Sequence, residues 1–228
     1  LGLLARAVFP FPTEVLTKLF PAYDWQRVVP RLVRAGLARR GTFAVEVDDS
    51  VIRSLRSDRT EWNALNDTWI ARLKELSGYY DIAALLAVHL IAARRLPEAG
   101  RAVVDVAQAT DLGEWNAIYL VLLESFVRPR VLAKLDGQTR VEVINSYGRC
   151  LLEAGRHLEA SRAFERLYTF SRRLRNAWGA GQALLHAGLA AHRLGDDVRS
   201  QRFYERCAAH ARRRRDNFLL GRALNNLA

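Results

Sequence analysis

Apolar residues recur at helical spacing along most of the chain and at strand spacing in one short stretch. Residues 1–8 predict a helix that stops before Pro10, and Thr13 is placed to cap a second helix over residues 14–20. A third helix is predicted over residues 25–35, because its apolar positions share one face: Trp25, Val28, Val29, Leu32 and Val33.

Asp24 can cap this third helix and Gly36 is placed to end it, while Pro30 is expected to kink it or to move its start later. Two strands are predicted next, over residues 37–40 and 43–47, the second alternating as a half-buried strand does. Three helices and a two-stranded wing resemble a winged helix, and LVRAGLARRGTFAVEV carries the resemblance.

Only helical spacing is present between residues 57 and 136. Residues 61–80 predict one long amphipathic helix, with Trp62, Leu65, Trp69, Leu73 and Leu76 along one stripe. Two helix pairs are predicted after it, over residues 81–93 with 97–109 and 114–126 with 128–135. Helix hairpins in series are typical of a helical array.

From Gly137 to Ala228 the pattern repeats after forty residues. The matched pairs are Gly148 and Gly188, Gly155 and Gly195, Arg162 and Arg202, Phe164 and Tyr204, Glu165 and Glu205, and Arg166 and Arg206. The same offset relates Arg172, Arg173 and Arg175 to Arg212, Arg213 and Arg215. It also relates Gly181, Ala183 and Leu184 to Gly221, Ala223 and Leu224. So many matches at one offset indicate one structural unit that is present more than once.

Each repeated feature has a predicted packing role. Gly148 and Gly188 fall in mid-helix, where glycine costs about 1 kcal/mol relative to alanine, so a close approach by another helix is expected. Gly155 and Gly195 suit a left-handed turn after the first helix of each pair. In the second helices, a small residue and an aromatic one lie one turn apart and are expected to face the first helix: Ala160 with Phe164, and Ser200 with Tyr204.

These residues resemble the tetratricopeptide repeat, which has small residues in both helices, a glycine at the turn and an aromatic residue in the second helix. The resemblance covers residues 137–228, and more loosely residues 81–109. The period of forty exceeds the usual value of about 34, which implies longer helices, as in kinesin light chains and bacterial signalling ATPases. Ile144 and Leu184 replace the usual tryptophan, and the proline after the second helix is absent.

The net charge of +11 comes almost wholly from arginine, and residues 137–228 hold 17 arginines against 8 aspartates and glutamates. Such a surface attracts nucleic acid, anionic lipid or an acidic protein. The basic runs at residues 171–175 and 211–216 fall at the ends of second helices, so the preferred interpretation is that they complement the helix dipoles. Binding of nucleic acid or phosphate is the alternative.

The chain shows no run of about 18 apolar residues and no leader pattern, so we expect no membrane association. Cys150 and Cys207 lie in helical patterns without a CxxC motif, which favours a reducing, cytoplasmic location. Because the chain lacks methionine and starts with Leu-Gly, we expect it to be part of a longer protein.

No motif for catalysis or metal binding is present. The sequence has no GxxxxGK[ST] loop, no HExxH and no histidine cluster at ligand spacing, and the glycines of residues 179–181 are better explained by a helix boundary. We therefore expect no catalytic residue, no metal ligand, no cofactor and no enzyme activity in this chain, and leave the activity of a full-length protein open.

In tetratricopeptide arrays the first helices line a concave groove that binds a protein or peptide. The resemblance implies that asparagines there bond a ligand backbone and that arginines hold carboxylates. The inner-face residues implied here are Glu142, Asn145, Arg149, Glu153, Gln182, Leu185, Leu189, His192, Arg193, Arg222 and Asn225.

The predicted fold is mainly α: a winged helix over residues 1–56, a helical connector over residues 57–136 and a tetratricopeptide (TPR-like) α-solenoid over residues 137–228. This order resembles the C-terminal half of signal-transduction ATPases with numerous domains, the STAND class. In that family the repeats sense a ligand and release autoinhibition. The resemblance implies a protein or peptide partner, the option of self-association, and ATP or ADP only in a full-length protein. Asp48 stands where many relatives have histidine, so nucleotide sensing is not carried over to it.

A second interpretation is a transcriptional regulator, because Arg27, Arg31 and Arg34 share one face of the third helix, as in a helix that reads DNA. The net charge through Arg56 is only +4, from nine basic and five acidic residues, which suits a structural winged helix equally well. A scaffold without a switch is a third interpretation, since fold does not fix function.

Overall fold

The computed structural model of the chain describes residues 13–40, 45–76, 80–109, 113 and 116–227. Within these residues the chain is mainly helical, as predicted, with one pair of short strands. It divides into two compact units, which we call the first unit (Leu1–Ala99) and the second unit (Gly100–Ala228). The predicted helix of residues 1–8 and the start of the second predicted strand lie outside the described residues. The domain boundaries at residues 56 and 136 stay predictions.

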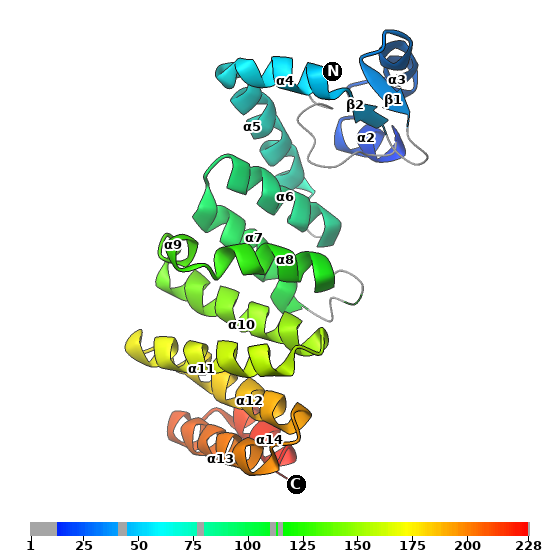
Figure 1. Cartoon of the computed structure of the whole chain (residues 1–228). Coiled ribbons are helices and arrows are strands. Elements are labelled where there is room, and N and C mark those ends of the chain that lie inside the picture. The colour runs from blue at the N-terminus through cyan, green and yellow to red at the C-terminus, as the bar shows by residue number, and fades with distance from the viewer. Residues whose placement is uncertain (1–12, 41–44, 77–79, 110–112, 114–115, 228) are drawn as a thin grey trace. The chain divides into compact units, whose positions relative to one another are not determined.

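The first unit combines helices with a small antiparallel strand pair in its described residues (Figure 1). Ala38 lies opposite Val47 across the two strands, and Arg40 lies opposite Val45. The elements are α2 (Thr13–Leu19), α3 (Trp25–Arg34), β1 (Ala38–Arg40), β2 (Val45–Val47), α4 (Asp49–Ser57), α5 (Arg59–Glu75), α6 (Tyr80–Ala92) and the beginning of α7 (Leu96–Ala109).

The start of α3 is fixed by two contacts. The backbone N–H of Arg27 donates to Asp24 Oδ1 at 3.2 Å, so Asp24 is the predicted N-cap. The indole Nε1 of Trp25 donates to the carbonyl of Phe20 at 3.0 Å, and the Trp25 side chain is buried. Because these contacts precede Pro30, the proline lies inside the helix and does not move its start.

Helix α5 begins two residues before its predicted start, because Asp58 accepts hydrogen bonds from the backbone N–H groups of Thr60 and Glu61. Helix α4 was not predicted; Asp48 caps it by accepting from the Ser50 N–H at 2.8 Å. Hydrogen bonds from Ser50 lower the pKa of Asp48. Aspartates therefore set the starts of two consecutive helices.

A buried polar contact joins α5 to α6. Asn66 Nδ2 donates to the His89 carbonyl at 3.1 Å, and Asn66 Oδ1 lies 2.9 Å from His89 Nδ1. The His89 ring stacks on Trp69, and Phe20 meets Trp69 edge to face with ring centroids 4.7 Å apart. The core of the first unit thus connects α5 both to α6 and to the end of α2.

The second unit consists of helices that run back and forth over short connections. The first helices of the repeat begin at residues 137, 177 and 217, and the second helices at residues 157 and 197, so the forty-residue period of the sequence is also the period of the structure. Its elements after α7 are α8 (Asn116–Phe126), α9 (Pro129–Leu132), α10 (Gly137–Glu153), α11 (His157–Arg173), α12 (Ala177–Arg193), α13 (Asp197–Arg214) and α14 (Asn217–Asn225).

The connections between these helices repeat as well. Gly155 and Gly195 follow α10 and α12 with φ of 73° and 76°, which confirms the predicted left-handed turns. A side-chain cap precedes each first helix, and sequence analysis missed this repeated signal: Asp136 before α10, Asn176 before α12 and Asp216 before α14.

Close packing within each pair is also confirmed. The ring of Phe164 on α11 lies against Gly148 on α10, and the ring of Tyr204 on α13 lies against Gly188 on α12. Ser200, one turn before Tyr204, donates its hydroxyl hydrogen bond to the Gly188 carbonyl at 2.9 Å. The glycines therefore serve helix packing.

Candidate functional site

The predicted binding face is built from α10, α12 and α14, which pack beside one another in the second unit. Its residues differ in exposure. Asn145 and Leu185 are buried; Glu142, Arg149, Gln182 and Leu189 are partly buried; Glu153, His192, Arg193, Arg222 and Asn225 are exposed.

Asn145 makes a buried contact across two helices. Its Oδ1 lies 3.3 Å from Nδ1 of His186 on α12, and both side chains are almost inaccessible to solvent. Burial lowers the pKa of His186 to about 3, and the positive charges of Arg149 and Arg222 add to the effect. His186 is therefore neutral at neutral pH, and its Nδ1 donates to Asn145. Sequence analysis named Asn145 as a ligand-bonding residue, whereas the structure gives its oxygen a partner inside the protein.

Arg149 is held in place by the backbone. Its Nη1 donates to the carbonyl of Ala107 on α7 at 3.3 Å. Arg222 reaches the same region from α14, with its guanidinium 5.9 Å from the Phe218 ring. Since both arginines act on His186, the three first helices bring two positive charges close to one buried imidazole. Whether these helices form the predicted inner face of a groove stays a prediction.

Polar side chains lie at both ends of these helices. His192 Nδ1 lies 3.4 Å from Asp197 Oδ1 at the turn between α12 and α13, and the neighbouring Arg193 is exposed. At the start of α10, the Gln138 amide donates a hydrogen bond to Oε1 of Glu142, so one oxygen of that carboxylate already has a partner. The face thus offers cationic and amide donors beside limited apolar surface, a combination suited to carboxylates and peptide backbone.

Groups that could carry out chemistry are sparse in the described part of the chain. There, no three His, Cys, Asp or Glu side chains are grouped so that they could hold a metal ion. Burial raises the pKa of Cys150 to about 12 and that of Cys207 to about 11, so both stay protonated.

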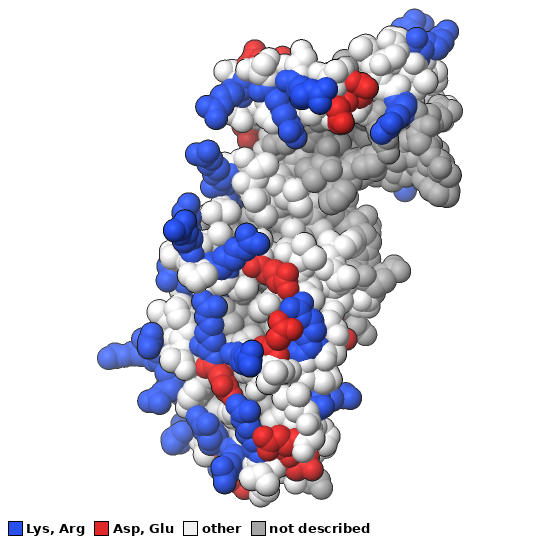
Figure 2. Space-filling model, viewed as in Figure 1, with Lys and Arg blue, Asp and Glu red and all other residues white. Residues whose placement is uncertain are grey.

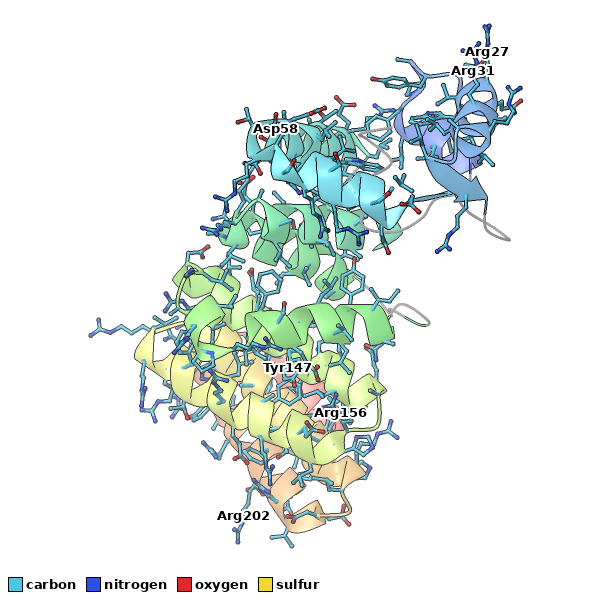
Figure 3. The ribbon with its side chains drawn as sticks, turned by 45° about the horizontal axis from the view of Figure 1, so that its top comes forward. Arg27, Arg31, Asp58, Tyr147, Arg156 and Arg202 are labelled. Carbon is cyan, nitrogen blue, oxygen red and sulfur yellow. The ribbon has the colours of Figure 1, made fainter. Side chains whose placement is uncertain are left out.

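The second candidate surface is α3 of the first unit. Arg27, Arg31 and Arg34 are exposed there, and Arg34 Nε donates to the Pro30 carbonyl at 3.4 Å. Arg27 and Arg31 project from the same part of α3 (Figure 3). All three arginines are thus accessible to solvent, and their role in reading DNA stays a prediction.

Positive side chains are spread widely over the face shown in Figure 2, with acidic ones among them. Some form ion pairs: Arg156 donates to Glu159 at 2.7 Å and to Glu124 at 3.0 Å. Sequence analysis missed one grouping, in which the two basic runs at the ends of α11 and α13 meet around a common pocket. Across the described ranges, no helix combines the length and the apolar character needed to cross a membrane.

No protein-family model matches the sequence, and no curated protein matches it. Among solved structures, the chain is similar to a Signal Transduction ATPase with Numerous Domains (STAND) protein with a tetratricopeptide repeat sensor from Pyrococcus horikoshii. The two are 13% identical with a TM-score of 0.35, over 99% of this chain and 46% of the other. This chain thus spans about half the length of that protein, and the likeness is too low to support an argument about fold or function.

Proposed function

We propose that the chain is the ligand-sensing and regulatory protein–protein interaction region of a STAND-type NTPase. The proposal takes the first unit to begin with a winged helix and the second unit to hold tetratricopeptide-like repeats in an α-solenoid. The observation that carries it is the forty-residue period, which recurs in the helix bounds, in the caps and in the glycine–aromatic contacts. A stack of equivalent helix pairs offers an extended surface for a polypeptide.

The proposed ligand is a protein or peptide with acidic side chains, bound along α10, α12 and α14. Arg193 and Arg222 are exposed there and suit carboxylates, while Gln182 and Asn225 suit the peptide backbone. Leu189 adds a partly exposed apolar contact. Arg149 is assigned a positioning role beside His186, because it already donates to the backbone of α7.

The regulatory part of the proposal concerns regions beyond the 228 residues. Ligand binding to the repeats would release an effector that they restrain, and ATP or ADP would bind in the NTPase region. Asp48 is assigned no part in sensing nucleotide, since its carboxylate caps α4. Self-association is proposed as part of the activated state.

The experiment is affinity purification of the tagged full-length protein from its source cells, with nuclease treatment of half the sample. We expect a polypeptide to be retained in both halves. Its complex with the 228-residue chain is then reconstituted from purified components. Recovery of nucleic acid alone, which disappears on nuclease treatment, would contradict the proposal.

The alternative is a DNA-binding regulator with a repeat sensor, favoured by the exposure of Arg27, Arg31 and Arg34 on α3. Replacing the three with alanine should then weaken duplex binding and reduce its salt dependence by about one unit of slope for each phosphate that is no longer neutralised. Arg53→Ala with Arg56→Ala and Arg59→Ala is the control, because it removes the same charge from three exposed residues of α4 and α5 in the same unit. Equal effects of the two sets would exclude readout by α3.

A further inference from the structure

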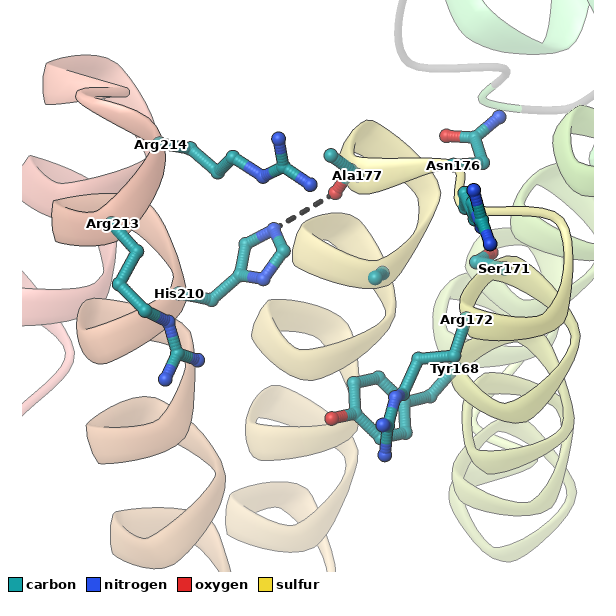
Figure 4. A pocket seen from close by; sticks show the side chains of 10 residues that line it. Tyr168, Ser171, Arg172, Asn176, Ala177, His210, Arg213 and Arg214 are labelled. Atoms are coloured by element: carbon teal, nitrogen blue, oxygen red, sulfur yellow. Dashed lines mark hydrogen bonds between the residues drawn. The ribbon is translucent and has the colours of Figure 1, made fainter.

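A basic pocket lies in the second unit between the end of α11, the start of α12 and the end of α13 (Figure 4). Its volume is about 720 Å³, within the range of about 300–1,000 Å³ that small-molecule sites occupy. Arg172 and Arg175 line it from one basic run, and Arg213 and Arg214 line it from the other. Among the described residues, no carboxylate lines this pocket.

The four arginines are not neutralised by the described part of the protein. No carboxylate there lies within ion-pair distance of any of them, whereas Arg156 pairs with Glu159 and Arg199 pairs with Glu165. The guanidinium of Arg172 lies 5.9 Å from the Tyr168 ring, which also lines the pocket. Because like charges around one space repel each other, an anion in the pocket would relieve that repulsion.

Helix dipoles account for only part of this charge. The C-terminal end of a helix is equivalent to about half a negative charge, which one cation more than offsets. The ends of α11 and α13 each bring two arginines to the pocket. The start of α12 contributes the positive end of a third dipole, since Asn176 and Ala177 line the same space. A positive surplus of several charges therefore remains.

Ser171 and His210 shape the inner wall of the pocket. Ser171 lines the pocket, its side chain is fully buried, and its Oγ has no hydrogen-bond partner among the described residues. The Oγ packs against Gly179 of α12, where a Cβ would lie 2.5 Å from it, so Ser171 fixes the close approach of α11 to α12 beside the pocket. His210 Nε2 donates to the Ala177 carbonyl at 2.9 Å, and this bond holds α13 against the start of α12 at the pocket wall.

We propose that this pocket binds a small soluble ligand that carries two or more phosphate groups. Guanidinium groups bind phosphate oxygens in pairs, and four of them around one hollow match a multiply charged anion better than a single carboxylate. One hollow bounded by three helix ends also suits a single compact ligand, whereas a nucleic-acid strand needs contacts spaced along its backbone. The site is separate from the proposed peptide-binding residues and does not depend on their role.

The test is isothermal titration of tripolyphosphate into the 228-residue chain at physiological ionic strength. We expect saturable binding of one ligand per chain. Arg213→Gln with Arg214→Gln should weaken it by about tenfold or more, since two charge-assisted donors are removed. The matched control is Arg202→Gln with Arg212→Gln, which removes the same charge from exposed positions of α13 outside the pocket and should change the affinity by less than about threefold. Thermal unfolding of each variant checks that the fold is kept.

Two outcomes would overturn the proposal at once. Equal weakening in both double variants would mean that tripolyphosphate responds to net charge alone, and the absence of saturable binding would mean that the pocket holds no phosphate ligand. A third arm titrates a single-stranded oligonucleotide. If it binds more tightly than tripolyphosphate and is weakened only in the Arg213 and Arg214 variant, the pocket belongs to a nucleic-acid backbone instead.

Discussion

The ring of Phe164 packs so closely on Gly148 that a Cβ on the glycine would lie 2.5 Å from Phe164 Cε1. Forty residues later the contact recurs, with a Cβ on Gly188 lying 2.6 Å from Tyr204 Cε1. Both aromatic side chains are buried. The pair of α10 and α11 and the pair of α12 and α13 are thus joined by the same contact, which requires glycine on one helix and an aromatic ring on the other.

Replacing either glycine by alanine should destabilise the fold. Alanine favours a helix by about 1 kcal/mol over glycine, but the overlap with the ring is expected to outweigh this gain and to lower the free energy of unfolding by about 1–3 kcal/mol. Urea unfolding followed by circular dichroism measures the change for Gly148→Ala and Gly188→Ala.

Gly221→Ala is the matched control. Gly221 lies on α14, the third of the first helices, and a Cβ there would have no neighbouring atom within 4 Å among the described residues. It should leave the free energy of unfolding unchanged or raise it by up to about 1 kcal/mol. If all three alanine variants behaved alike, close packing would not be the reason for the repeated glycines.

Stability should depend on pH through His186. Burial lowers its pKa from 6.5 to about 3, so the unfolded chain takes up a proton below pH 6.5 that the folded chain does not. The free energy of unfolding that depends on a neutral His186 is therefore fully present above pH 6.5, and it declines as the pH falls from there toward about 3. The slope from this one group is at most about 1.4 kcal/mol per pH unit.

His186→Gln keeps a side chain that can donate to Asn145 but removes the titrating group. The free energy of unfolding of this variant, measured by urea titration over the same pH window, should fall less steeply than that of the original chain. Parallel slopes for the two proteins would show that His186 does not stay neutral in the fold.

The negative charge of the Asp136 cap should stabilise α10 and with it the fold. The Thr139 N–H and hydroxyl and the nearby Arg101 lower the pKa of Asp136 from 3.8 to about 2. Asp136→Ala should cost about 0.5–2 kcal/mol at neutral pH. Because the pKa is lowered in the fold, this difference should shrink as the pH falls from about 4 toward about 2. Asp105→Ala, at an exposed position of α7, is the control and should cost little in urea unfolding; an equal cost would rule out a specific cap at Asp136.

Several of these features follow from local sequence patterns and others do not. Gly155, Gly195 and the Asp24 cap were predicted, because a turn or a cap depends on a few neighbouring residues. Helix α4 was missed because its apolar positions are few, although Asp48 signals its start. The repeated caps before α10, α12 and α14 were visible in the sequence and were overlooked.

Contacts between helices were predictable only where a residue type demands them. A glycine in mid-helix calls for a close neighbour, so the approach of Phe164 to Gly148 could be inferred. The contact of Asn145 with His186 joins residues 41 positions apart, and the meeting of the two basic runs around one pocket depends on how three helices cross. Spacing along the chain does not determine which of these side chains face each other.

The two cysteines should be inert in the folded chain. Cys150 and Cys207 are 1% and 0% exposed, and burial raises the pKa of each thiol. The thiolate is the reactive form, so Ellman's reagent should label neither thiol under native conditions and both in concentrated guanidinium chloride. Fast labelling of either thiol in the native chain would contradict the packing of α10 or α13.

Binding of a polypeptide by the face of α10, α12 and α14, as proposed, is tested most directly by the affinity of the purified partner for two matched variants. Arg193→Glu with Arg222→Glu changes exposed residues of that face, and Arg202→Glu with Arg212→Glu makes the same charge change on α13. Calorimetric titration should show an affinity lower by about tenfold or more for the first variant and by less than about threefold for the second. Equal weakening in both, or weakening confined to the α13 variant, would contradict the claim.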